Sequence, residues 1–423
     1  MGTGGTGNYF VVTDTSGNVI AVRHYETSYG AANNIAPYTM MFLGEPQVDG
    51  ANTAPRYITH FWNLSSGTVE DFPNVISHHD IQYDQINNTF LTIQNYVRNN
   101  SVLFDKIVQV DPYGNVIWTW DEYNYIPLSE ASPFNELSTL DGQTVEDLTH
   151  SNTLDWHYND SIIYLNVRNV NTFFKINQTT GNLIWACGEF GNFTLLGADG
   201  QPVPSLWYHC HDVKEVAPDV FTLFDNDYNN NTNPYDCHSR MVELTLNETS
   251  MTEYVNWSWE APTAYWTPYA GANLLLPNGD FIGDFADPTH QNPSYQQNLP
   301  WDFTDRGAVF VEVNATGQVV RTFTFPVGCY AYRIETVTNP SVITPIPTHV
   351  VSPTPTPVIT PTPVITLSPT PVITQTPSVS PSSHPSINRQ TIINSVVLAA
   401  VIVEVVVLAV LFYMRKRISN HKN

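Results

Sequence analysis

The amino-acid sequence predicts an all-β fold over residues 1–337, arranged as a six-bladed β-propeller. A turn followed by an apolar strand recurs six times, and pairs of short strands joined by Asn, Asp or Pro turns lie between the copies. No stretch of this region has the apolar spacing of a long helix. A propeller explains the sequential copies better than a sandwich, because each blade contains four strands and the blades repeat around an axis.

The recurring turn begins with Asp or Asn and carries glycine in five of its six copies. Asp and Asn side chains bond to their own backbone in turns, and glycine adopts the left-handed conformation without strain. The copies begin at Asp14, Asn63, Asp111, Asn177, Asn247 and Asn314. The strands after the turns carry tryptophans, which we expect in the core between blades, namely Trp118, Trp120, Trp185, Trp257 and Trp259.

Three copies of the paired-strand signature carry histidine where the first strand of a blade begins. They read SHHDIQYD, THSNTLDW and CHDVKEVA. Equivalent strand starts in neighbouring blades converge on the central channel of a propeller. We therefore predict that His150, His211 and one histidine of the first copy share an axial pocket. In that copy His79 is preferred to His78, because it aligns with His211.

A single arginine is expected to join these histidines. Arg168 ends the second strand of one blade, and Arg98 is its copy one blade earlier. The chain has 16 basic against 39 acidic residues and a formal net charge of −23, which argues against a nucleic-acid partner. A guanidinium in so acidic a chain is suited to holding an oxyanion.

These motifs, in their order and spacing, resemble the arylsulfotransferase family over roughly residues 35–330. The resemblance implies a propeller enzyme that moves a sulfuryl group from an aryl sulfate ester to a phenol, with no nucleotide, cofactor or metal. It implies a ping-pong reaction through a sulfated histidine. The catalytic residues that it assigns are His211 as nucleophile, His79 and His150 beside it, and Asn152 and Arg168 around the transferring group.

Two departures from the family pattern leave alternatives open. Cys210 stands where glutamine is usual, and the motif after Trp185 reads ACGEF instead of containing Leu-Gly-Gly. A non-catalytic surface propeller that binds glycan or protein partners is one alternative, and it would be preferred if Arg168 faced solvent. A metal site that uses His209, His211, Asp212 and a histidine of a neighbouring blade is another.

The end of the chain predicts a membrane anchor. Residues 338–388 form a Pro/Thr-rich linker, which we expect to be extended because proline blocks helix and sheet hydrogen bonding. Residues 389–414 are predicted to form a transmembrane helix, because the stretch from Ile392 to Met414 is mostly apolar and long enough to span a bilayer, and the basic tail 415–423 follows. The positive-inside rule then places the tail in the cytoplasm and the propeller outside. No signal peptide is visible at the start, so we expect that one precedes the sequence given.

Glycosylation sequons and cysteines agree with an extracellular address. Asn-x-Ser/Thr occurs at Asn63, Asn87, Asn99, Asn159, Asn177, Asn192, Asn230, Asn247, Asn256 and Asn314. The four cysteines allow three pairings, and two disulfides are expected among Cys187, Cys210, Cys237 and Cys329.

Overall fold

The computed structural model describes residues 8–25, 28–46, 57–99, 101–126, 136–140, 143–228, 237–286, 307–326 and 329–337. These residues lie in one compact unit, Met1–Thr348. The predicted linker, membrane helix and tail lie outside the described residues, as does the sequon at Asn230. In the part of the chain that is described, no helix has the length and apolar character needed to cross a membrane.

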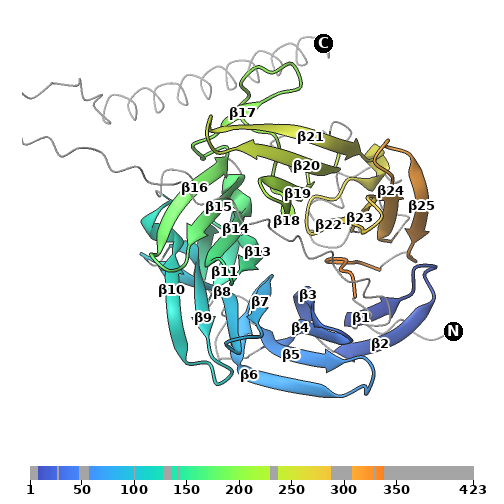
Figure 1. Cartoon of the computed structure of the whole chain (residues 1–423). Helices are drawn as coiled ribbons and strands as arrows, with labels where there is room; N and C mark the ends of the chain where they lie inside the picture. Colours follow the sequence, from blue (N-terminus) through green and yellow to red (C-terminus); the bar gives the residue numbers. More distant parts are fainter. Residues whose placement is uncertain are drawn as a thin grey trace, which may run out of the picture. The chain divides into compact units, whose positions relative to one another are not determined.

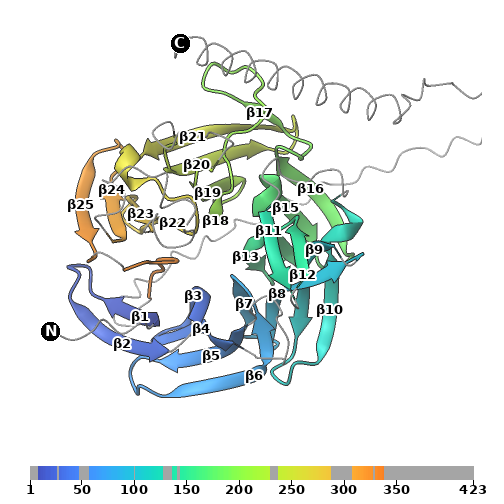
Figure 2. The same cartoon turned by 180° about the vertical axis from the view of Figure 1, so that it is seen from behind.

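The described strands form six sheets around a common centre (Figures 1 and 2). Five of them contain four antiparallel strands in sequence order, here called blades 1 to 5. Blade 1 comprises β3 (Ser28–Ala36), β4 (Thr39–Pro46), β5 (Tyr57–Asn63) and β6 (Val69–Ser77). Blade 2 comprises β7 (Ile81–Asp84), β8 (Thr89–Arg98), β9 (Val102–Val110) and β10 (Val116–Asp121), extended by β11 (Glu136–Leu140) and β12 (Gln143–Asp147).

Blades 3 to 5 follow the same order. Blade 3 comprises β13 (Ser151–His157), β14 (Ile162–Val167), β15 (Thr172–Asn177) and β16 (Asn182–Gly188). Blade 4 comprises β18 (His211–Ala217), β19 (Val220–Asp225), β20 (Arg240–Asn247) and β21 (Thr252–Glu260), with β17 (Thr194–Leu196) added in parallel to β21. Blade 5 comprises β22 (Ala272–Leu275), β23 (Phe281–Phe285), β24 (Val309–Val313) and β25 (Val319–Thr324).

The sixth sheet is a two-stranded hairpin, β1 (Asn8–Thr13) with β2 (Val19–Tyr25). It contains the first copy of the recurring turn, which in every blade joins the third strand to the fourth. The described residues thus contain five complete blades and the outer hairpin of another, where the sequence predicted six complete blades. The propeller architecture itself is confirmed.

The recurring turn works as its composition predicts. The first residue accepts a backbone hydrogen bond on its side-chain oxygen, as Asp14 does from Ser16 N at 2.8 Å and Asn63 from Ser65 N at 3.0 Å. The fourth or fifth residue of five copies is a glycine with positive φ, for example 72° at Gly67. The copy without glycine adopts the same backbone, with Met251 at φ 51°. Turn geometry therefore outweighs the left-handed cost at Met251.

Apolar clusters fill the four interfaces between consecutive blades. Between blades 2 and 3, Phe104, Trp120 and Phe174 are buried together, and between blades 3 and 4, Trp185 and Phe221 are. A buried aromatic side chain of this size contributes roughly 1.5 to 3 kcal/mol to stability. Trp118, Trp257 and Trp259 pack against the same clusters in partly buried positions, so the tryptophan prediction is confirmed.

The cysteine prediction is wrong. None of the four cysteines forms a disulfide bond; three of them are buried and Cys329 is exposed. Cys187 donates to a carboxylate oxygen of Glu253 at 2.6 Å, while Cys210 donates to Asn166 Oδ1 at 3.3 Å. An even number of cysteines therefore did not imply disulfides. The thiols of Cys187 and Cys210 hydrogen-bond to polar side chains in the core instead.

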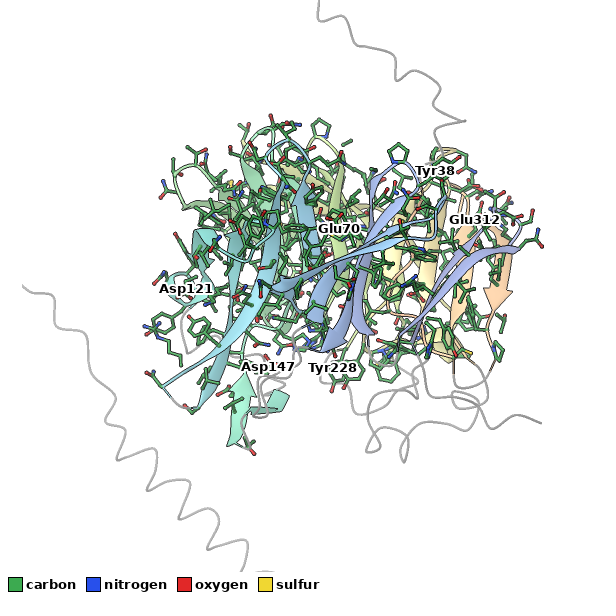
Figure 3. All side chains as sticks on the ribbon, turned by 90° about the horizontal axis from the view of Figure 1, so that it is seen from below. Tyr38, Glu70, Asp121, Asp147, Tyr228 and Glu312 are labelled. Atoms are coloured by element: carbon green, nitrogen blue, oxygen red, sulfur yellow. The ribbon has the colours of Figure 1, made fainter. Side chains whose placement is uncertain are left out.

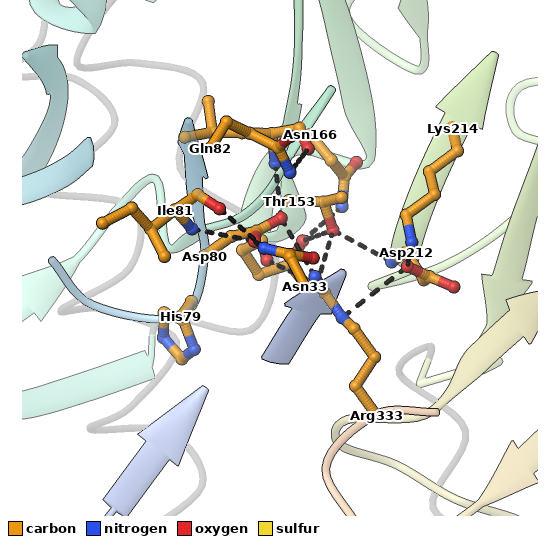
Figure 4. Close-up of polar contacts among 12 residues, drawn as sticks. Asn33, His79, Asp80, Ile81, Gln82, Thr153, Asn166, Asp212, Lys214 and Arg333 are labelled. Atoms are coloured by element: carbon orange, nitrogen blue, oxygen red, sulfur yellow. Dashed lines mark hydrogen bonds and ion pairs between the residues drawn. The ribbon is translucent and has the colours of Figure 1, made fainter. Parts of the chain in front are cut away.

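Carboxylates beside the first strands link the blades near the axis. Asp80 Oδ2 accepts the Leu154 N–H of blade 3 at 2.9 Å, and Asp212 Oδ2 accepts the Asn273 N–H of blade 5 at 3.2 Å. Residues 329–337 return to this region, where Arg333 reaches between the two carboxylates (Figure 4). The ring is thus fastened at its centre by a segment that follows its last blade.

Candidate active site

The candidate site lies at one end of the ring. In the view of Figure 3, Asp147 and Tyr228 lie at the lower edge and Tyr38 at the opposite edge. Asp147 contacts His150, and Tyr228 lies near Arg168, so both belong to the site. Strands of blades 2, 3 and 4 bring the predicted histidines to this end.

Left-handed backbone precedes the first strands of these blades. φ is 59° at His79, 52° at His150 and 55° at His209. By backbone conformation, His209 is therefore the equivalent of His79 and His150 in blade 4. The alignment of the sequence repeats had placed His211 at that position. Non-glycine residues with positive φ cost free energy and concentrate at functional sites, which is consistent with a shaped pocket here.

Three histidines from three blades nevertheless gather as predicted. The rings of His79 and His150 lie 4.7 Å apart between centroids. His211 lies close enough for its charge to lower the pKa of His79. His78 turns away, with Nε2 2.8 Å from Asp105 Oδ1 in the buried core of blade 2. Asp147 Oδ2 lies 2.6 Å from Nδ1 of His150 and orients that ring.

The tautomer of His211 follows from its contacts. Nδ1 lies 2.7 Å from Asn226 Oδ1, and Nε2 accepts the backbone N–H of Ala270 at 3.2 Å. The Asn226 amide group donates to the carbonyls of Thr267 and Ala270, so its oxygen must face His211. Nδ1 therefore carries the proton and Nε2 carries the lone pair.

Burial keeps His211 neutral. Burial and then the charge of Arg168 hold the pKa of His211 well below its ordinary value of 6.5. Burial and then the neighbouring His150 lower the pKa of His79 in the same way. Protonating either ring would place a cation in a poorly solvated cluster that already contains a guanidinium. A neutral imidazole with a basic nitrogen is a nucleophile, and its neutral neighbours can accept protons.

Arg168 lies inside the site and is 1% exposed. It opens a short 3-10 helix, η2 (Arg168–Val170), directly after β14. Nη1 donates to Asn169 Oδ1 at 2.7 Å, and Cζ lies 5.3 Å from the centre of the Tyr269 ring and 5.9 Å from that of Tyr228. Arg168 therefore does not face solvent, which is the arrangement that would have favoured the non-catalytic binding propeller.

The other predicted polar residues have different contacts. Asn152 donates through Nδ2 to the carbonyl oxygen of Cys210 at 3.0 Å and holds the backbone just before His211. Arg98, the sequence copy of Arg168, places Cζ 3.3 Å from the centre of the Tyr123 ring. Arg98 therefore packs on blade 2.

Two residues of the segment 329–337 complete the site, and the sequence did not predict them. Tyr332 Oη lies 2.9 Å from His79 Nδ1. Arg333 contacts three blades: Nη1 lies 3.0 Å from Asp80 Oδ2, Nη2 donates to Asn152 O at 3.2 Å, and Nε lies 3.6 Å from Asp212 Oδ1. Only the scarcity of arginine in an acidic chain could have drawn attention to this segment.

The metal alternative finds little support in the geometry. His209 Nδ1 lies 2.6 Å from the Tyr228 carbonyl oxygen, and Asp212 faces Lys214 and Arg333. Among the residues that the structure describes, no three His, Cys, Asp or Glu side chains gather as a metal ion would require. His211 is directed to Asn226 and Ala270.

A ring of β-blades with neutral imidazoles near a buried guanidinium defines a propeller protein suited to transfer of an anionic group. The sequence matches the model of the arylsulfotransferase (ASST) family over residues 4–333. The chain belongs to this family. Membership indicates a sulfotransferase enzyme with an aryl sulfate donor and a phenol acceptor. No curated protein matches the chain.

Several solved structures are distantly similar. The periplasmic gluconolactonase PpgL of Pseudomonas aeruginosa is 12% identical, with 75% of this chain and 92% of that chain covered and a TM-score of 0.39. The GH43_1 enzyme of Xanthomonas citri is 11% identical, with 74% and 93% covered and a TM-score of 0.36. Similarity at this level carries no inference about function.

Proposed function

We propose that the protein transfers a sulfuryl group from an aryl sulfate ester to a phenol through a sulfohistidine at His211. The observation that carries the proposal is the tautomer of His211, with Nδ1 bonded to Asn226 and the lone pair on Nε2. Only a neutral imidazole with a defined basic nitrogen can attack the sulfur atom.

In the first half-reaction, His211 Nε2 releases the hydrogen bond from Ala270 N–H and attacks the sulfur of the donor, and the bond from sulfur to the aryl oxygen breaks. The phenolate leaves and takes up a proton from solvent. Arg168 stabilises the equatorial oxygens, where negative charge is greatest, and its burial strengthens this interaction. His79 and His150 hydrogen-bond the leaving oxygen, and Asp147 orients the second of them.

In the second half-reaction, an acceptor phenol replaces the first product. Its oxygen attacks sulfur, its proton moves to a neutral histidine, and the bond from Nε2 to sulfur breaks. Burial lowers the pKa of His79 and keeps its ring neutral, so the ring can take this proton for the transfer and then release it to solvent. Asn152 acts as a positioning residue through its bond to Cys210 O, next to the nucleophile.

Transfer from para-nitrophenyl sulfate to phenol tests the proposal. His211→Ala should abolish release of nitrophenol while the protein stays folded, as judged by its far-UV spectrum. His157→Ala is the matched control, because His157 is a half-exposed histidine that contacts Asp155 and Glu215 away from the site. Wild-type turnover by His211→Ala would end the proposal.

We also propose that this enzyme works at the cell surface, held by the apolar segment 389–414 on the Pro/Thr-rich linker. The sequons and the basic residues after the apolar segment support this address. Fractionation of cells that express the full chain should leave it in the membrane pellet after alkaline extraction. External protease should remove the propeller from intact cells. A soluble or protected propeller would contradict the proposed location.

A further inference from the structure

A tyrosine of the chain itself lies beside the histidines of the candidate site. Tyr332 Oη is 2.9 Å from His79 Nδ1, and the two rings are stacked with centroids 6.1 Å apart. The same ring lies edge-on to His211, at 6.4 Å between centroids and 83° between planes. Tyr332 thus contacts both the proposed proton acceptor and the proposed nucleophile.

The segment that carries Tyr332 is held by ion pairs to blade 2 and to blade 4. The Arg333 side chain, 2% exposed, pairs with Asp80 of blade 2 and lies between that carboxylate and Asp212 of blade 4. Glu335 pairs with Lys214 on the inner strand of blade 4. These buried ion pairs are specific contacts, so the phenol is held in one position beside the histidines and not merely near them.

We propose that Tyr332 is an intramolecular sulfuryl acceptor, so that the enzyme converts its own tyrosine into a tyrosine sulfate ester. The inference rests on the proposed sulfohistidine at His211. Tyr332 Oη attacks the sulfur carried by His211 Nε2, the bond between nitrogen and sulfur breaks, and the bond between oxygen and sulfur forms. The phenolic proton moves to His79 Nδ1. His211 returns to its neutral form, so charge and atoms balance.

The contacts of Tyr332 supply a base and a counter-charge for this transfer. His79 Nδ1 lies within hydrogen-bond distance of the phenolic oxygen, and burial and the neighbouring His150 lower the pKa of His79, so its ring is neutral when the transfer begins. The sulfate ester formed would carry a negative charge beside the Arg333 guanidinium, whose Cζ lies 5.9 Å from the centre of the Tyr332 ring. Because Tyr332 is tethered, the step is unimolecular and competes with free phenols through its high effective concentration.

The experiment incubates the full chain with para-nitrophenyl sulfate and no added phenol, followed by peptide mapping by mass spectrometry. The wild type should gain one sulfuryl group on the peptide that contains Tyr332. Tyr332→Phe should lose this modification, and His211→Ala should lose it as well. Tyr330→Phe is the matched control, because it removes a hydroxyl two positions away in the same segment and should keep the modification on Tyr332.

The possible results separate the two proposals. If the wild type sulfates added phenol but Tyr332 stays unmodified, the inference is overturned while the proposed function survives. If Tyr332 is modified equally in His211→Ala, the route through sulfohistidine is overturned. If neither free phenol nor Tyr332 is sulfated, both proposals fail. Modification that depends on both Tyr332 and His211 supports the inference.

Discussion

The side-chain oxygen of Asn226 lies 2.7 Å from Nδ1 of His211, and this contact determines which nitrogen of the imidazole can react. Asn226 is itself fixed by two backbone carbonyls, so its amide cannot turn round without losing both hydrogen bonds. A series of hydrogen bonds, from the carbonyls of Thr267 and Ala270 through Asn226 to His211, therefore fixes the reactive nitrogen of His211.

Replacing Asn226 tests this series of hydrogen bonds. Asn226→Ala removes the acceptor for Nδ1–H, and we expect kcat for donor cleavage to fall roughly 100-fold, because the ring is no longer held in the reactive tautomer. Asn226→Asp keeps an acceptor but adds a negative charge, which raises the pKa of His211. The activity of this variant should recover partly, and the acid limb of its pH–rate profile should move to higher pH. Equal losses without a shift in the pH profile would indicate a merely structural role.

The pH dependence of the first half-reaction reports the protonation of His211. Because burial and Arg168 hold the pKa of His211 well below 6.5, the nucleophile stays neutral as pH falls through 6.5. A stopped-flow measurement of nitrophenol release should therefore show its acid limb well below pH 6.5. A limb at or above pH 6.5 would contradict the assignment.

The lowered pKa of His211 also makes the folded protein less stable at acid pH, and this effect must be measured as a control for the pH–rate profile. Below pH 6.5 the unfolded chain binds a proton on His211 that the folded imidazole does not, so the free energy of unfolding falls as pH falls. Tryptophan fluorescence recorded at each pH separates loss of folded protein from protonation of the nucleophile.

Arg333→Met tests the anchoring of the central segment. It keeps an apolar stem but leaves Asp80 and Asp212 without their guanidinium partner, and breaking a buried pair in this way costs about 3 to 5 kcal/mol. Lys175→Met, which breaks a pair with the partly exposed Glu248, should cost about 1 kcal/mol or less. Urea denaturation measures both, and similar values for the two variants would refute a central role for Arg333.

Two turn glycines test the repeat. Gly67 and Gly114 have φ of 72° and 84°, so alanine is strained at both positions by about 1 kcal/mol. A Cβ at Gly67 meets no atom within 4 Å, whereas one at Gly114 would lie 2.6 Å from the Asn74 carbonyl oxygen. Gly114→Ala should therefore be less stable than Gly67→Ala by about 1 to 3 kcal/mol in chemical denaturation. Equal stabilities would show that the contact with blade 1 relaxes freely.

The sequence predicted the parts of the fold that depend on local chemistry. Each Asx turn with a left-handed residue became a hairpin, including the copy that has Met251 in place of glycine. The complete sixth blade was not found in the described residues, because a turn motif specifies two strands and not the two that precede them. The prediction of two disulfides was wrong, because the number of cysteines does not show which of them lie close together in space.

The site was partly predictable for the same reason. His79, His150 and His211 follow a repeat, so their convergence could be expected from blade geometry. Tyr332 and Arg333 follow no repeat, and their partners lie far away in sequence, as the contact between His79 and Tyr332 spans 253 positions. Asn226 was missed because its role appears only through the orientation of its amide.

Mass spectrometry of the protein quenched at neutral pH during turnover of an aryl sulfate, with the digest searched for sulfated histidine, addresses the nucleophile most directly. The account predicts a sulfuryl group on the peptide with His211, formed as fast as the first nitrophenol is released and discharged when phenol is added. A full burst of nitrophenol with no label on His211, or a label that phenol does not remove, would contradict it.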